Sequence, residues 1–422
     1  MVFFRFLMFD VLSVPAILVG LVALIGLWAQ RKPSTDCIKG TIKTIMGFII
    51  LGAGADVVVG ALNHFSEMFQ MGFGITGIVP NNEAVVSIAQ KAFGKEMALI
   101  MFFGMVVNIA IARFTRFKYI FLTGHHTLYM GIMIAAILAA GGLSGAGLIA
   151  LGSILLGIVM VFFPAIAQPF MKEITGTDEV AFAHFGTTGY VLAALIGKWF
   201  GNKEESTEKL VLPKGLSFLR DTPVAIAFTM GIIYLISALA AGKSFTEELS
   251  GGQHFIVFSL LQAITFAGGV FIILQGVRMI LAEIVPAFKG IAEKLVPDAK
   301  PALDCPVVFP YAPTAVLVGF LSSFAAGVIG MFLLMALGLP VIVPGVVPHF
   351  FCGATAGVFG NATGGRKGAL WGAFVHGILI TILPVLLMPV LGSLGYANTT
   401  FSDADFGVVG ILLGNILKIF VQ

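Results

Sequence analysis

The chain has 422 residues, of which 58% are hydrophobic and 11% are charged. A soluble domain carries about 25% charged residues, so this chain cannot cover its whole surface with polar side chains, and most of that surface is expected to face lipid. The formal net charge is only +3 and nothing in its distribution indicates nucleic-acid binding. The 52 glycines suit close helix packing and interrupted helices in membranes.

Apolar runs long enough to cross a membrane recur along the chain, since one helical span needs about 17–25 residues. They lie at 11–29, 41–61, 97–113, 119–141, 145–169, 222–241, 254–275, 313–338, 369–392 and 407–421. Three further apolar segments, at 174–200, 302–312 and 340–364, are interrupted by glycine, proline and polar residues, which is typical of re-entrant hairpins and half-helices. The pattern predicts an all-α polytopic membrane protein with one membrane domain over residues 1–422. Ten spans are indicated, with room for one or two more.

Lysine and arginine gather on one side of these spans. They follow the runs that end at 29, 113 and 275, and they fill the hydrophilic loop 200–221, which is too short to fold alone. Loops rich in lysine and arginine are cytoplasmic in most membrane proteins. The N-terminus is therefore predicted to lie outside, on the periplasmic side, and the C-terminus in the cytoplasm.

Residues 276–296 have the pattern of an amphipathic helix rather than a span. Apolar residues recur at helical spacing from Val277 to Leu295, while Arg278, Glu283 and Lys289 occupy the opposite face. A helix of this kind lies in the plane of the membrane surface. We expect it at the cytoplasmic interface.

Short sequence matches indicate two related halves. Gly40-Thr-Ile-Lys43-Thr-Ile is similar to Gly276-Val-Arg278-Met-Ile, and Phe121-Leu-Thr-Gly124 is similar to Phe350-Phe-Cys-Gly353. Related halves with broken helices are found in many transporters. The matches predict an internal repeat.

The polar stretch Phe-Leu-Thr-Gly-His-His-Thr-Leu-Tyr at 121–129 interrupts the apolar sequence. Lipid strongly disfavours polar groups and unpaired backbone, so such a break indicates a cavity that binds something polar. His125 and His126 could instead cap a helix, with backbone carbonyls as partners. A neutral imidazole offers one donor and one acceptor, which suits sugar hydroxyls or an enediol. Cysteines and carboxylates are not spaced as metal ligands, so no metal is expected.

Two carboxylates are further candidates. Asp304 and Glu83 each follow a proline and enter an apolar run, where an acid commonly caps a helix. They could also accept hydrogen bonds from solute hydroxyls, or carry a proton coupled to transport. His184 lies in another polar break, and structural and functional interpretations of it are evenly balanced.

Three function classes remain for such a chain. They are a group-translocating permease, which only a family resemblance would favour, an ion- or proton-coupled secondary transporter of a sugar or small organic anion, and a lipid-acting enzyme, which is disfavoured because no nucleophile–base set is clustered. No ATP-binding phosphate loop is present. The chain is not expected to be catalytic alone, and no cofactor is expected.

Several motifs in order resemble the ascorbate-type EIIC permease of the bacterial phosphotransferase system. They are Lys39-Gly-Thr-Ile-Lys-Thr-Ile, Phe121-Leu-Thr-Gly-His125, the Lys203-Glu-Glu-Ser loop, Gln275-Gly-Val-Arg-Met279 with Ile-Leu-Ala-Glu283, and Leu303-Asp-Cys305. The resemblance extends from about residue 10 to 420. The ordered set is more specific than any one motif.

The resemblance implies a multi-pass protein of the bacterial inner membrane, a homodimer with about eleven transmembrane helices per protomer. Each protomer would have a core domain that carries the solute and a scaffold-like domain, related by an elevator-type movement. The solute would be L-ascorbate, phosphorylated at the cytoplasmic side by a separate EIIB protein that bears a phosphocysteine.

The resemblance also assigns a solute site, although parts of it depart from the family pattern. Tyr129 stands where the family often has glutamine, Phe185 replaces an amide, and Asn82 and Glu83 stand where the best-known members have a Thr-Tyr pair. These departures bear on the exact substrate, for which another anionic or polyol sugar is the alternative to ascorbate. The implied solute-binding residues are His125, His126, Thr127, Tyr129, His184, Phe185, Asp304, Asn82 and Glu83.

Overall fold

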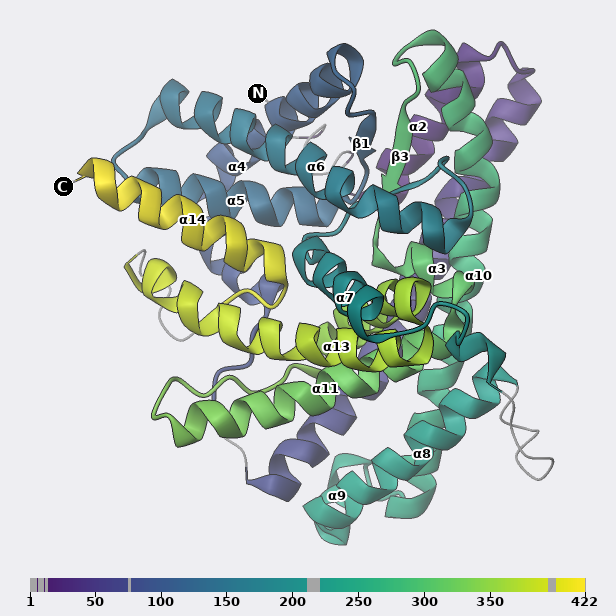
Figure 1. The fold of residues 1–422 in the computed structure, drawn as a ribbon, viewed down its shortest axis with the longest axis vertical. Helices are drawn as coiled ribbons and strands as arrows, with labels where there is room; N and C mark the ends of the chain where they lie inside the picture. Colours follow the sequence, from purple (N-terminus) through teal and green to yellow (C-terminus); the bar gives the residue numbers. More distant parts are fainter. Residues whose placement is uncertain are drawn as a thin grey trace.

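The computed structural model describes residues 6, 11, 14–74, 77–210, 221–393 and 400–421. The longer helices are α2 (Pro15–Ala29), α3 (Ser34–Phe73), α4 (Asn82–Phe114), α5 (Gly124–Ala140), α6 (Gly145–Thr175), α7 (Thr187–Phe200), α8 (Thr222–Ala241), α10 (Phe255–Lys294), α11 (Pro313–Ala336), α13 (Ala354–Ser393) and α14 (Ala404–Val421). Shorter helical elements are η2 (Thr207–Lys209), α9 (Lys243–Leu249), η4 (Cys305–Tyr311), α12 (Val346–Pro348) and the π-helical turn η5 (His349–Gly353). Helices α4, α5, α6 and α14 lie on one side of the molecule and α2, α3 and α10 on the other (Figure 1).

Six of the described helices are long and apolar enough to cross a membrane, or seven if the bent pair Ile226–Ala241 and Lys243–Leu249 forms one span. Shorter apolar helices accompany them at Ala16–Ala29, Gly124–Ala140 and Ala404–Leu417. The predicted class, a helical multi-pass membrane protein, agrees with this architecture. The number of eleven spans, the re-entrant hairpins and the two related halves stay predictions.

Helices α3 and α10 are 40 residues each and pack along one another through a line of glycines. A Cβ atom on Gly276 would lie 2.9 Å from the Gly47 carbonyl oxygen, and one on Gly54 would lie 2.9 Å from the Gly269 carbonyl oxygen. Such contact between backbones needs residues without side chains. The segment 276–296, predicted as a separate amphipathic helix, continues from the preceding span as the second half of α10. Its place at the membrane interface stays a prediction.

Helix α13 is broken just after the predicted re-entrant segment 340–364. The break is at Gly365, whose φ of 58° is readily reached only without a side chain. A side chain on Gly360 would collide with the backbone of Gly368, so the chain folds back on itself there. The tip packs against α7, where Gly197 contacts Gly364. The polypeptide therefore reverses direction near Gly365. The re-entrant position of this segment in a membrane stays a prediction.

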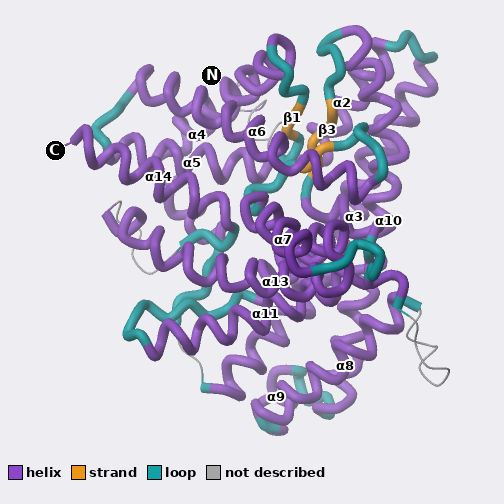
Figure 2. The backbone as a smooth tube through the Cα atoms, viewed as in Figure 1, coloured by secondary structure: helices purple, strands orange, loops and turns teal. Residues whose placement is uncertain are grey.

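Three short parallel strands lie among the helices (Figure 2). They are β1 (Tyr119–Phe121), β2 (Ala181–Phe182) and β3 (Lys300–Leu303), in the order β1-β3-β2. These short strands do not change the predicted all-α class, and they lie at the start of the run 119–141, within the segment 174–200 and at the start of the segment 302–312. Backbone groups that the helices leave unpaired at these breaks find their partners in a sheet, as burial in apolar surroundings requires.

The sheet separates two apolar cores. Successive side chains of a strand point to opposite faces, and here Phe121 and Ala302 join a core formed with α4, α5, α6 and α14. Phe182 and Leu303 join the other core, formed with α2, α3, α8, α10 and α11. The carboxyl ends of the three strands therefore emerge together at the boundary between the two cores.

Candidate functional site

The polar residues singled out in the sequence follow directly after the three strands. Because the strands are parallel, their carboxyl ends meet at one edge. The backbone pairing continues past β1 and β2, where Leu122 donates to the Ala302 carbonyl at 3.0 Å and Ala183 donates to the Leu303 carbonyl at 2.7 Å. This pairing brings together His125 and His126 after β1, His184 after β2, and Asp304 after β3.

The accessible part of the site is a histidine–aspartate pair. His125 Nε2 lies 3.5 Å from Asp304 Oδ2, with the two side chains 40% and 23% exposed. Asp304 also caps η4, since its Oδ1 accepts a 2.7 Å hydrogen bond from the Cys305 backbone. It lines a small hollow with Phe48 and Leu51 of α3 and with Ile280 of α10. Both interpretations made from the sequence, a cap and a site carboxylate, therefore fit Asp304.

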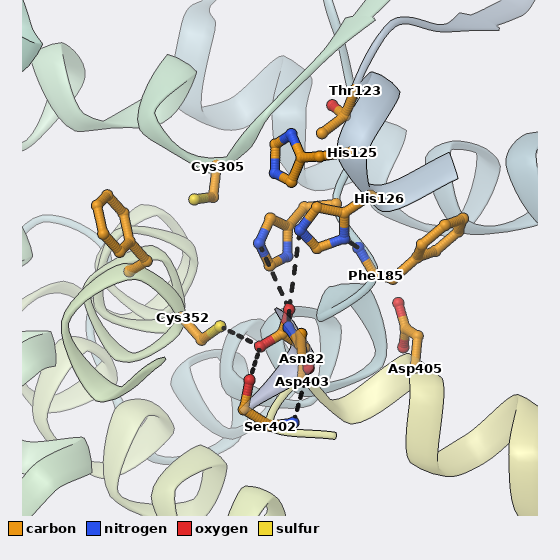
Figure 3. A network of polar contacts seen from close by, with 12 residues as sticks. Asn82, Thr123, His125, His126, Phe185, Cys305, Cys352, Ser402, Asp403 and Asp405 are labelled. Carbon is orange, nitrogen blue, oxygen red and sulfur yellow. Dashed lines mark hydrogen bonds and ion pairs between the residues drawn. The ribbon is translucent and has the colours of Figure 1, made fainter. Parts of the chain in front are cut away.

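A second histidine–aspartate pair lies behind the first and is buried. His126 Nε2 is 3.8 Å from Asp403 Oδ2, and both side chains are at most 5% exposed. Asn82 donates to Asp403 Oδ2 at 3.0 Å and Ser402 Oγ donates to Oδ1 at 2.7 Å. Figure 3 shows this network, in which the Asn82 carbonyl oxygen also accepts a hydrogen bond from the Ser402 backbone at 2.9 Å.

His184 connects the two pairs. Its Nε2 is 3.9 Å from an oxygen of Asp304 and 3.9 Å from an oxygen of Asp403. Its other ring nitrogen, Nδ1, lies 2.9 Å from the Tyr190 hydroxyl. A hydrogen bond between nitrogen and oxygen is usually 2.7–3.2 Å long, so the gaps on both sides of Nε2 are too long for direct bonds. The ring nitrogens of the site therefore face the two carboxylates at distances longer than a hydrogen bond.

The remaining predicted site residues have varied surroundings. The Thr127 hydroxyl donates to the Thr123 carbonyl, and the ring of Phe185 stacks on Phe121 in the apolar core. The ring of Tyr129 lies beside both histidines, with centroids 5.8 Å from His125 and 6.2 Å from His126. Glu83 is in the first turn of α4, and its side chain lies outside the described part of the chain. Direct contact of these four with a solute stays a prediction.

Sequence reasoning missed the acids at the start of α14. Asp403 belongs to the buried pair, and Asp405 caps α7 by accepting hydrogen bonds from Thr187 and Thr188 at 2.7 and 2.9 Å. The available signal was the pair of acids in Ser402-Asp403-Ala404-Asp405, immediately before an apolar run. The Cys352 thiol also donates to Asp403, at 3.5 Å.

The same residues include groups with metal-ligand chemistry. Ligand atoms lie within 4.8 Å of one another in three sets, and two of those sets contain His126. The Phe185 backbone N–H donates to Nδ1 of His126 at 3.2 Å, so a neutral ring carries its hydrogen on Nε2. That nitrogen is the one that faces Asp403, and a protonated nitrogen cannot bind a metal. The site is better suited to hydrogen bonds with a polar solute.

The opposite, amino end of the sheet carries a closed charge cluster. Asp178 lies 2.8 Å from Lys172 and 2.6 Å from Lys300, the first residue of β3, and accepts a 2.8 Å hydrogen bond from Gln168. Burial opposes ionisation of the Asp178 carboxyl. The hydrogen bonds from Lys172, Lys300 and Gln168 outweigh it, and the pKa falls from 3.8 to about 2. The cluster joins the end of α6 and the segment before β2 to the start of β3.

The fold is that of a multi-pass helical membrane protein with a cluster of polar side chains at strand ends between two apolar cores. A family model described as "PTS system sugar-specific permease component" (EIIC-GAT) matches residues 10–405, so the chain belongs to this family. Such a component is the transporting subunit of a phosphotransferase system and is not catalytic alone. Among curated proteins, the chain is 27% identical over 461 aligned positions to the "Ascorbate-specific PTS system EIIC component" of Mycoplasma pneumoniae, covering 96% of this chain and 69% of that protein.

Proposed function

We propose that this chain imports L-ascorbate, which a partner EIIB protein phosphorylates from its phosphocysteine at the cytoplasmic side. The observation that carries the proposal is the convergence of His125, His184 and Asp304 at three strand ends, in a chain whose family transports sugars. The similarity to the Mycoplasma pneumoniae protein favours ascorbate within that family.

The chemistry of the site fits a compact solute with many oxygens. Imidazole rings can donate to or accept from hydroxyl groups, and a carboxylate accepts from them. Asp304 lines the small hollow, and the Nε2 atoms of His125 and His184 lie 3.5 and 3.9 Å from its carboxylate oxygens. L-Ascorbate presents an acidic enediol beside further hydroxyls, so one molecule offers both an acceptor oxygen and donor hydroxyls to this set.

The remaining parts of the proposal concern the membrane context. The protein would be a homodimer in the bacterial inner membrane, with a periplasmic N-terminus and a cytoplasmic C-terminus, as the distribution of lysine and arginine favours. The Asp304 hollow lies between η4 and the α3–α10 pair, which is where a core domain would move against a scaffold-like domain in an elevator mechanism.

Uptake of radiolabelled ascorbate into vesicles tests the function. The vesicles would contain phosphoenolpyruvate and the soluble phosphotransferase proteins including EIIB, and each assay would be run with and without an ionophore. We expect accumulation of phosphorylated ascorbate that needs the phosphoryl donor and is insensitive to the ionophore.

The alternative is a proton- or ion-coupled transporter of a sugar or small organic anion, in which the buried His126–Asp403 pair could exchange a proton. That function predicts uptake without a phosphoryl donor and collapse of uptake when the ionophore is added. Either result would remove group translocation as the function of this chain.

A further inference from the structure

Among the described residues of the site, Asp403 has the most neighbouring hydrogen-bond donors. Its Oδ1 accepts from Ser402 Oγ at 2.7 Å and from the Cys352 thiol at 3.5 Å. Its Oδ2 accepts from Asn82 at 3.0 Å and faces His126 Nε2 at 3.8 Å. A carboxylate has about four acceptor positions; hydrogen-bond donors occupy three of them, and the fourth faces the His126 ring nitrogen. Asp403 is therefore held in one orientation by three separate segments of the chain.

The hydrogen on His126 is fixed from the other side. Because the Phe185 backbone N–H donates to Nδ1, the neutral ring must carry its hydrogen on Nε2 and point it at Asp403. The acid and the backbone amide together leave the ring one tautomer and one orientation. His126 is buried and does not itself reach the hollow.

The half-exposed ring of His125 and the buried ring of His184 both pack on this fixed ring. The His126 ring centroid lies 4.0 Å from that of His184 and 4.7 Å from that of His125. The fixed ring therefore determines where both neighbours stand. His184 Nε2 lies 3.9 Å from an oxygen of Asp304, which is longer than a direct hydrogen bond.

We infer that Asp403 is a positioning residue for solute binding: it fixes His126, and through His126 the placement of His125 and His184 against Asp304. The inference rests on the proposed transport function and sharpens its substrate class. The gap between His184 and Asp304 suits two adjacent oxygens of a solute, one that accepts from the imidazole and one hydroxyl that donates to the carboxylate. An enediol or a vicinal diol has this arrangement.

A structural role for Asp403 must be separated from the positioning role. Asp403 also joins the segment after residue 400 to the start of α4 through Asn82, so a single substitution could act by loosening that junction. One atom, Oδ2, contacts both Asn82 and His126. Exchanging the two side chains, as Asn82→Asp with Asp403→Asn, therefore tests the two roles in one protein.

The exchange has opposite effects on the two partners. The new amide N–H₂ at 403 can donate to the new carboxylate at 82, which still accepts from the Ser402 backbone. The same N–H₂ opposes the Nε2–H of His126, donor against donor. The exchange therefore keeps the junction and removes the anchor of the imidazole rings.

The experiment compares wild type, Asp403→Asn and the exchange variant. Ascorbate affinity and thermal stability would be measured on purified full-length protein, and ¹⁵N-histidine NMR would be recorded without solute. We expect Asp403→Asn to lose stability and to bind about 10- to 100-fold more weakly, the loss typical of a charged hydrogen-bonding group. The exchange variant should regain the stability but not the affinity, and its His126 resonances should differ from those of wild type.

Recovery of affinity in the exchange variant, or wild-type affinity in Asp403→Asn, would overturn the positioning role. Unchanged His126 resonances in the exchange variant would overturn it independently of any solute. Failure of the wild-type protein to bind ascorbate would instead count against the proposed function, and the NMR comparison would still decide the role of Asp403.

Discussion

An acidic side chain lies beside basic side chains at each end of the small sheet, but the distances between them differ. At the amino end, the Asp178 carboxylate meets Lys172 and Lys300 at 2.8 and 2.6 Å. At the carboxyl end, Asp304 stands 3.5 Å from His125 and 3.9 Å from His184. Groups in direct contact satisfy one another and hold the chain in place, whereas groups kept just beyond bonding distance leave their hydrogen-bonding capacity for a third molecule.

The largest expected effect is at the open end. Replacing Asp304 or His125 with alanine should weaken ascorbate binding by about 1–3 kcal/mol, because a polar group of the bound solute loses its hydrogen-bonding partner. Calorimetry on the purified variants measures this directly. Asp178→Asn, at the closed end of the same sheet, is the matched control and should bind ascorbate as wild type does. Wild-type affinity in both site variants would remove these residues from the solute site.

A smaller effect, on stability alone, is expected at the closed end. Asp178→Asn should lower the free energy of unfolding by about 1 kcal/mol, a value kept low because the carboxylate is 44% exposed and water screens its ion pairs. Thermal unfolding in detergent is the measurement. A loss of affinity without loss of stability would contradict the division between the two ends.

The contribution of Asp178 to the free energy of unfolding should depend on pH between about 4 and 2. The Asp178 pKa is about 2 in the folded protein and about 3.9 in an unfolded chain. A lowered pKa stabilises the folded state above about pH 4, and this stabilisation disappears as the pH falls toward 2. The difference in melting temperature between wild type and Asp178→Asn should therefore shrink over this range. A difference that stays constant would show that Asp178 does not act through its charge.

The smallest effect is expected from Lys172→Met. The lysine side chain is half exposed, and Lys300 and Gln168 remain as partners of Asp178. Ion pairs of this kind contribute about 0–1 kcal/mol. We expect a shift in melting temperature smaller than that of Asp178→Asn and no change in ascorbate affinity. A larger shift would mean that Lys172, rather than Lys300, holds the cluster together.

The helical membrane class and several residues of the candidate site could be predicted from the sequence, because both have local signals. Long apolar runs predicted the spans, and polar breaks in them predicted His125, His184 and Asp304. The three strands were not predicted because each has four residues or fewer and lies at the edge of an apolar run, where no alternation of polar and apolar residues marks it.

Asp403 could not be placed from the sequence for a different reason. It meets Asn82 across 321 positions of the chain, and only the folded arrangement brings the start of α14 beside the strand ends. Its local pattern, an acid before an apolar run, is that of an ordinary helix cap, and its neighbour Asp405 likewise makes its contacts with a distant helix, α7. The family resemblance assigned Asn82 and His126, which contact or face this acid, but not Asp403 itself.

The glycine contacts between α3 and α10 have a mechanical consequence. Gly47 meets Gly276 and Gly54 meets Gly269, so the contacts repeat every seven residues and alternate with bulkier side chains. Sliding one helix past the other by a single turn would press isoleucine or leucine side chains into backbone. These two 40-residue helices therefore pack in a single register, and we expect them to move together. The fixed register leaves the face of α3 and α10 that borders the Asp304 hollow as a surface along which the proposed elevator movement could occur.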